Sequence, residues 1–135
     1  MPIVVDTSAI LAVVFNESTK PRIVEATKGQ ELLAPDSLQW EIGNAFTAMF
    51  KRNKITLDQA TTGFKIYKQI SLRYPKIDFN HALEISYENK VYAYDAYFLS
   101  LAKKQKCPFI TLDMPLQRLA SQIGIKIIEV NNDSI

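Results

Sequence analysis

The chain has 135 residues and a formal net charge of +2, with 47% hydrophobic and 22% charged residues. A chain of this length usually makes about one domain, and the composition is globular rather than disordered. One cysteine excludes an intrachain disulfide framework and a zinc site built on several cysteines. The mild positive charge does not by itself indicate nucleic-acid binding.

The first residues show no targeting signal. The first cation is Lys20, so the basic start of a signal peptide is missing. The longest apolar run, Ala9 to Phe15, is far shorter than the roughly 20 residues of a membrane span. A lone cysteine is usual in a reducing compartment, and we therefore expect a cytoplasmic protein.

The chain opens with a strand and a helix. Ile3–Val5 is a β-branched run that predicts a strand buried on both faces. A helix follows to about Phe15, and Asp6, Thr7 and Ser8 are each suitable as its N-cap. These polar side chains thus follow the carboxyl end of the first strand.

Helical patterns and short apolar runs alternate over the rest of the chain. Asn80 is the expected cap of one helix, and residues 77–79 before it are expected as a short strand or an extended loop. We expect strands over 32–34, 109–111 and 127–130, and helices over 20–28, 37–52, 57–73, 80–89, 95–106 and 114–122. This alternation predicts an α/β fold, with a central parallel sheet and helices on both faces.

Two aspartates are expected at one edge of that sheet. Asp6 directly follows the first strand, and Asp113 follows the strand that begins at Phe109. In open α/β sheets, ligands bind beyond the carboxyl ends of the strands. Both carboxylates therefore belong where such a sheet carries its chemistry.

Two further carboxylates lie on or beside apolar helix faces. Phe98 and Leu99 fall on the same side of a helical wheel as Asp95, which places this aspartate on the core-facing stripe. Glu41 lies at the border of the apolar stripe of the 37–52 helix. An isolated carboxylate near a core is costly unless it is paired, protonated or bound to a metal.

Asp6, Glu41, Asp95 and Asp113 are therefore the candidate catalytic and metal-binding residues. Clustered carboxylates raise one another's pKa, and a hard cation such as Mg²⁺ or Mn²⁺ relieves the repulsion. Such a site activates water for phosphodiester cleavage. Simpler interpretations stay open, since each aspartate also suits a helix cap and Glu41 suits a solvated helix face.

Nucleophilic catalysis has less support. Ser8 would need a base, and the one histidine, His81, begins a polar helix where a surface or capping role is expected. Cys107 precedes Pro108 at the start of a strand and is expected to be a small buried residue. Four glycines do not form a known phosphate-binding loop.

Four short segments occur in an order that a known family shares. They are Val4–Ala9, Ala34–Leu38 with Glu41 and Asn44, Tyr94–Tyr97 with Leu101 and Ala102, and Ile110–Asp113. In this order they resemble the PIN-domain ribonucleases of the VapC toxin type. The resemblance covers nearly the whole chain and is poorest over about 54–89.

The resemblance implies a three-layer α/β/α fold and a single PIN-like domain over residues 1–135. It also implies a Mg²⁺- or Mn²⁺-dependent endoribonuclease that acts as the toxin of a type II toxin–antitoxin system. Such a toxin forms a homodimer and is silenced by a cognate antitoxin protein. By position, the four carboxylates match the family's acidic site, and the hydroxyls that match its supporting positions are Thr7, Ser8 and Thr111.

Two other classes of function remain open. The first is a non-catalytic RNA- or protein-binding α/β domain, which has no need for four converging acids. The second is a small phosphotransfer domain. A haloacid-type phosphatase would have a second aspartate two residues after Asp6, where Ser8 stands.

Surface features suggest where partners bind. Basic clusters at 51–54, 65–76 and 103–106 suit RNA phosphates, although cations at helix ends also complement the helix dipole. Aromatic residues around Asp95 suit stacking on unpaired bases and are Tyr92, Tyr94 and Tyr97. Apolar residues on the first three helices predict a homodimer surface and include Phe15, Ile23, Trp40, Phe46 and Phe50.

Overall fold

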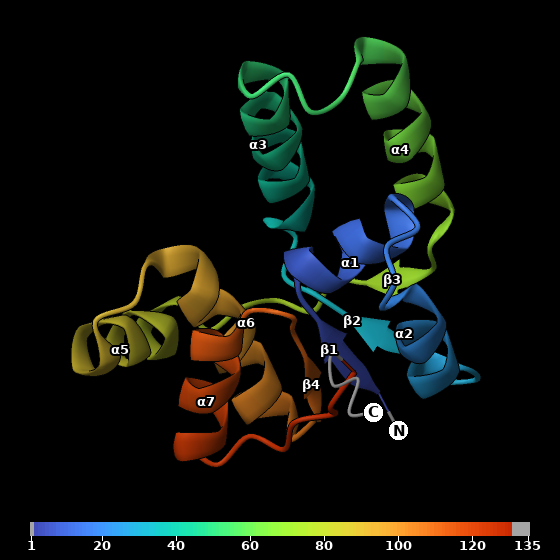
Figure 1. The fold of residues 1–135 in the computed structure, drawn as a ribbon. Coiled ribbons are helices and arrows are strands. Elements are labelled where there is room, and N and C mark those ends of the chain that lie inside the picture. Colours follow the sequence, from blue (N-terminus) through green and yellow to red (C-terminus); the bar gives the residue numbers. More distant parts are fainter. Residues whose placement is uncertain (1, 131–135) are drawn as a thin grey trace.

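The computed structural model describes residues 2–130 and contains a central sheet of four parallel strands (Figure 1). The spatial order is β3-β2-β1-β4, so β1 lies between β2 and β4. Val4 is the partner of Leu33 on one side and of Phe109 on the other. The strands are β1 (Ile3–Val5), β2 (Leu32–Leu33), β3 (Leu72–Arg73) and β4 (Phe109–Ile110).

Helices cover the sheet on both faces, which confirms the predicted α/β architecture. Helices α1 and α2 pack together, α1 also contacts α3 and α4, and α6 packs against β1 and against α5. The helices are α1 (Thr7–Val14), α2 (Lys20–Thr27), α3 (Leu38–Lys51), α4 (Leu57–Gln69), α5 (Phe79–Asn89), α6 (Ala93–Gln105) and α7 (Met114–Gln122).

The core lies between the sheet and these helices. All three residues of β1 are buried, as expected for a central parallel strand with both faces covered. Phe98 of α6 stacks on Phe109 of β4, with ring centroids 6.3 Å apart, and both rings are buried. Through this contact, the apolar face of α6 fixes the helix against the strand.

The largest error of the sequence analysis concerns the predicted helix over 57–73. Helix α4 ends at Gln69, its C-cap Ile70 is extended, and Leu72–Arg73 form the edge strand β3 beside β2. A strand of two residues carries no periodic pattern, so the sequence pattern extends the predicted helix over it. The sheet therefore gains a strand that the sequence did not predict.

Three smaller predictions also need correction. Only Ile127 of the expected 127–130 strand pairs with the sheet, through an isolated bridge to Phe109. Of the two alternatives for 77–79, the loop is confirmed for residues 77–78, and only Phe79 differs because it already begins α5. The N-cap of α5 is Asp78 rather than Asn80, because the Asp78 side chain accepts from the backbone N–H of His81.

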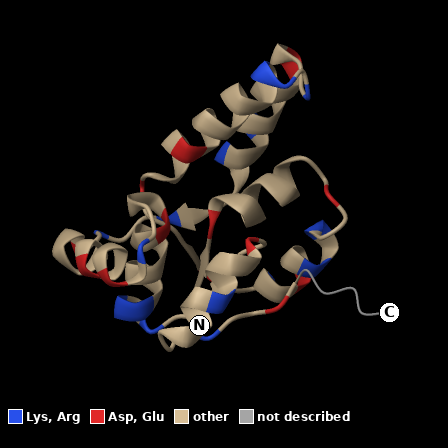
Figure 2. Ribbon diagram, turned by 60° about the vertical axis from the view of Figure 1, so that its left-hand side comes forward, with Lys and Arg blue, Asp and Glu red and all other residues tan. Residues whose placement is uncertain are grey.

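The expected dimer surface is only partly available. Ile23 and Phe46 are buried in the core, whereas Trp40 is 67% exposed. Helices α3 and α4 extend away from the sheet (Figures 1 and 2), and apolar side chains of both helices line a groove of about 500 Å³ between them. The apolar surface therefore belongs to the α3–α4 projection.

No helix within residues 2–130 is long and apolar enough to cross a membrane. This finding agrees with the absence of a long apolar run in the sequence.

Candidate active site

The four predicted carboxylates come from four different elements. Asp6 follows β1 as the N-cap of α1, and Asp113 follows β4 as the N-cap of α7. Glu41 and Asp95 lie in the first turns of α3 and α6. Because all strands are parallel, the helices that leave β1, β2 and β4 begin at one edge of the sheet.

Asp6 is the most buried of these groups, with only 5% of its surface exposed. Its Oδ1 accepts from the Ser8 hydroxyl at 2.6 Å and from the backbone N–H of Ala9 at 3.1 Å. Its Oδ2 accepts from the Thr111 hydroxyl at 2.5 Å. Asp6 thus both caps α1 and belongs to the candidate catalytic set. Its three hydrogen bonds hold the carboxylate in a single orientation.

The hydroxyls of Ser8 and Thr111 connect β1 to β4 at this edge. Ser8 Oγ accepts from the backbone N–H of Leu112 at 2.9 Å, and Thr111 Oγ1 accepts from that of Asp113 at 3.0 Å. Both hydroxyl protons are directed at Asp6. Ser8 is therefore placed to orient a carboxylate rather than to act as a nucleophile.

Glu41 is half-buried and held at both of its oxygens. Thr7 donates to Oε1 at 2.8 Å, and Ser37 donates to Oε2 at 3.0 Å. The Thr7 contact joins α1 to α3, so Glu41 is fixed close to the residue that follows Asp6. Sequence reasoning had missed the role of Ser37, although its position four residues before Glu41 on a helix is a usable signal.

Electrostatic repulsion links the four carboxylates. Burial is the main cause that raises the pKa of Asp6, to about 6, and the charge of Asp95 raises it further. Burial also raises the pKa of Glu41, with added repulsion from Asp6 and Asp95. The pKa of Asp95 is raised by burial and then by Asp113. The charged neighbours that shift these three groups are all carboxylates, as expected for a site that takes a cation.

The donor set fits a hard divalent cation, although the side chains do not already form a closed cage. Within residues 2–130, no three Asp, Glu, His or Cys side chains are close enough together to hold a metal ion. Mg²⁺ and Mn²⁺ accept carboxylate oxygens and retain several waters, so they do not need a closed all-protein cage. Asp113 is the most exposed member, and one of its oxygens already accepts from the backbone N–H of Leu116.

The buried carboxyl of Asp6 predicts a pH dependence of stability in the absence of divalent cations. Its pKa is about 6 in the folded chain and 3.8 without the fold, so the folded chain binds more protons between these values. The free energy of unfolding is therefore expected to fall by up to about 3 kcal/mol as the pH rises from 4 to 7. Urea denaturation in EDTA at several pH values measures this dependence.

The Asp6→Asn variant is the control for this titration, because it removes the buried carboxyl. Its stability should vary with pH much less than that of the wild-type chain over the same interval. An equal pH dependence in both proteins would show that Asp6 does not titrate as described.

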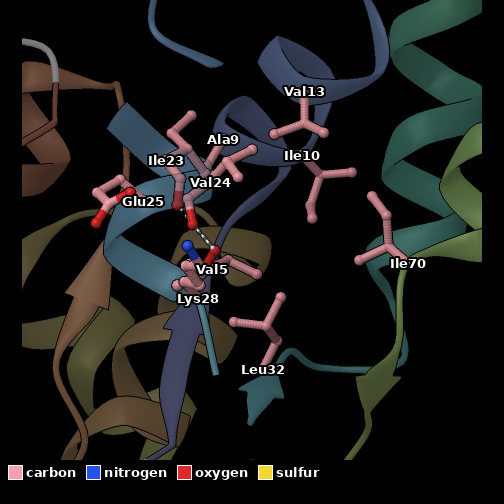
Figure 3. A pocket seen from close by; sticks show the side chains of 11 residues that line it. Val5, Ala9, Ile10, Val13, Ile23, Val24, Glu25, Lys28, Leu32 and Ile70 are labelled. Atoms are coloured by element: carbon pink, nitrogen blue, oxygen red, sulfur yellow. Dashed lines mark hydrogen bonds between the residues drawn. The ribbon is translucent and has the colours of Figure 1, made fainter. Parts of the chain in front are cut away.

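A separate apolar pocket lies beside α1 and α2 (Figure 3). It has a volume of about 370 Å³, and Ile10, Ile23, Leu32 and Ile70 are among its lining residues. None of the four candidate acids lines it. The pocket therefore has no part in the chemistry considered at the sheet edge.

The remaining reactive side chains have structural roles. His81 Nδ1 lies 2.7 Å from the hydroxyl of the buried Ser100, so the histidine joins α5 to α6 and does not serve Ser8 as a base. Cys107 is buried, as predicted, and its thiol donates to the backbone carbonyl of Gln105 at 3.4 Å.

Comparisons with known proteins place this architecture in a family. The profile of the PIN domain matches residues 3–122, and the chain belongs to that family. It is 27% identical to Ribonuclease VapC9 from Mycobacterium tuberculosis over 116 residues, which are 84% of this chain and 87% of the relative. The predicted resemblance to PIN-domain proteins of the VapC type is confirmed.

Solved structures share the fold at low sequence identity. PAE2754 from Pyrobaculum aerophilum has a TM-score of 0.71 at 17% identity, covering 94% of this chain and 83% of the other. VapBC2 from Rickettsia felis, solved with a DNA fragment from its promoter, has a TM-score of 0.66 at 12% identity, covering 95% and 98%. These likenesses confirm the predicted PIN-like α/β/α fold.

Proposed function

We propose that this protein is a metal-dependent endoribonuclease and the toxin of a type II toxin–antitoxin pair. The observation that carries the proposal is the set of four carboxylates at the carboxyl edge of the sheet, one of them buried and fixed by three hydrogen bonds. Membership of the PIN family and the similarity to a ribonuclease support RNA as the substrate.

Asp6, Glu41 and Asp95 are the proposed ligands of Mg²⁺ or Mn²⁺, and Asp113 completes or tunes the site. When bound, the cation supplies activation of a water molecule and neutralisation of charge on the phosphodiester. Neighbouring hydroxyl side chains position the carboxylates that would bind the cation. The hydroxyls of Ser8 and Thr111 donate hydrogen bonds that orient the Asp6 carboxylate and favour its ionised form. The hydroxyls of Thr7 and Ser37 orient the Glu41 carboxylate in the same way.

The surface around Asp95 supports an unpaired RNA substrate. Tyr92 is 90% exposed, Tyr94 is exposed, and Tyr97 packs edge-on against Tyr94 with ring centroids 6.0 Å apart. Exposed rings beside the acids can stack on bases that are not paired. We therefore propose single-stranded or looped RNA as the form that reaches the site.

Cleavage of total RNA tests the activity. Purified protein is incubated with total RNA in Mn²⁺ and, in parallel, in EDTA, and the new ends are mapped. Internal cuts at defined positions in Mn²⁺ alone are expected. Cleavage of equal extent in EDTA would contradict metal dependence, and binding without any cleavage would favour the non-catalytic RNA-binding alternative.

We also propose a homodimer and a cognate antitoxin as the assembly of this protein. The exposed Trp40 and the apolar groove between α3 and α4 support an interface on that projection. Light scattering at micromolar concentration should give twice the chain mass of 15.3 kDa. A monomer that persists in the presence of the antitoxin would exclude the dimer.

A further inference from the structure

A second pocket lies at the opposite edge of the sheet from the carboxylates and has a volume of about 630 Å³. The end of α6, the residues before β4 and the turn after α7 line it. Strand β4 and the bridge at Ile127 run parallel to β1, so the segments that precede them lie where the strands begin. Figure 2 shows Lys and Arg segments, in blue, gathered at this end beside the N-terminus.

The lining combines cations with apolar side chains. Lys103, Lys106 and Lys126 contribute ammonium groups from two different parts of the chain. Between them, the pocket is lined by Ala102, Cys107, Pro108 and Ile125. Apolar walls with a few convergent charges are typical of ligand pockets of this size, and phosphate is the anion that lysine ammonium groups bind in nucleic acids.

Within residues 2–130, Lys103, Lys106 and Lys126 form no ion pair. In the described part of the chain, Lys104 is the lysine that forms an ion pair, with Asp78 at 3.2 Å. Glu31, which precedes β2 at the same edge of the sheet, is paired with Arg73. As far as the described residues go, the three lysines of the pocket are therefore available to an external anion.

The ammonium group of Lys103 lies close to Gly124, in the turn after α7. The φ of Gly124 is +92°, and a Cβ atom at this position would lie 3.3 Å from Lys103 Nζ. A larger residue would strain the backbone and crowd the ammonium group. Glycine in the turn thus leaves room for the Lys103 ammonium group beside the pocket.

We propose that this pocket binds one nucleotide of the RNA substrate outside the cleavage site, with its phosphate on the lysines and its base against the apolar wall. The proposal rests on the function proposed above, which supplies RNA as the ligand. Asp95 and Lys103 lie in the first and last turns of α6, about 12 Å apart along the helix. At about 3.4 Å per stacked nucleotide, a strand of roughly four nucleotides spans that length.

RNA binding by a charge variant tests the proposal. A labelled 20-nucleotide single-stranded RNA is titrated with the wild-type protein and with Lys103→Gln/Lys106→Gln/Lys126→Gln in EDTA, where it stays uncut, at several salt concentrations. The variant is expected to bind at least about tenfold more weakly. The slope of log K against log salt concentration should become shallower by about 0.7, because the pocket is proposed to take one phosphate and each phosphate contact on a single strand contributes about 0.7.

The control variant is Lys28→Gln/Lys90→Gln/Arg118→Gln, which removes the same charge at exposed positions outside the pocket and outside the basic clusters of the sequence analysis. It should keep most of the wild-type affinity and salt slope. An equal loss in the two variants would reduce the effect to net charge and overturn the proposal. Full displacement of the RNA by an equal concentration of ATP would overturn it too, because the pocket would then hold a free nucleotide.

The binding assay tests the pocket proposal and the cleavage assay tests the catalytic function, so each proposal can be refuted without the other. If the wild-type protein binds RNA through the three lysines but cuts none in Mn²⁺, the proposed catalytic function is wrong and the pocket stands. If cleavage proceeds in Mn²⁺ and the pocket variant binds RNA like the wild-type protein, the pocket proposal is wrong and the catalytic function stands.

Discussion

Replacement of Asp6 by asparagine is expected to reduce RNA cleavage by more than about a hundredfold, the upper range for groups that only support a metal ligand. Asparagine keeps the size and polarity of the side chain but removes the charge that a divalent cation needs. The fold should survive and gain stability in EDTA, because a buried carboxylate with a pKa raised by burial is lost.

Initial cleavage rates in excess Mn²⁺ measure this effect, and two variants serve as comparisons. Asp36→Asn makes the same change at an exposed aspartate after β2, outside the four-carboxylate set, and should retain nearly full activity. Ser8→Ala should be much milder than Asp6→Asn, because it removes one of three hydrogen bonds to the carboxylate. A Ser8→Ala loss equal to that of Asp6→Asn would contradict the assigned roles.

The largest expected loss of stability follows from Phe98→Ala. Phe98 is buried and stacks on Phe109, one helical turn after Asp95. Removal of a buried phenyl ring leaves a cavity and typically lowers the free energy of unfolding by about 3–5 kcal/mol. That loss is a large fraction of the roughly 5–15 kcal/mol of a typical domain.

Urea denaturation at fixed pH measures the change, with Tyr92→Ala on the exposed start of α6 as the control. Tyr92 is 90% exposed, so its replacement should change the free energy of unfolding by less than about 0.5 kcal/mol. A loss of under 1 kcal/mol for Phe98→Ala would show that the α6–β4 contact is not part of the core described here.

The parts of the fold that the sequence predicted well are those with a strong local pattern. Ile3–Val5 combine β-branched side chains with a polar cap, and the strand is found at those residues. Strand β3 was missed because its residues, Leu72 and Arg73, are too few to show a strand period, and tertiary pairing with β2 decides their conformation. Sequence alone does not reveal such a partner.

The candidate site was predictable from topology, and its internal contacts were not. The rule that ligands bind at the carboxyl ends of parallel strands pointed to Asp6 and Asp113. The Thr7–Glu41 bond joins residues that lie far apart in the sequence, and only the packing of α1 beside α3 brings them together. The capping interpretation was correct for Asp6 and Asp113, which serve as N-caps at this edge of the sheet. It was wrong for Asp95, which lies in the first turn of α6 after the N-cap Tyr92.

The central claim is that the four carboxylates form one site for a divalent cation, and direct measurement of Mn²⁺ binding tests it most closely. Calorimetric titration is applied to the wild-type protein and to Asp6→Asn and Asp95→Asn, without RNA. The claim predicts saturable Mn²⁺ binding by the wild-type protein that is strongly weakened in both variants. Absence of Mn²⁺ binding in the wild-type protein, or equal binding in all three proteins, would contradict it.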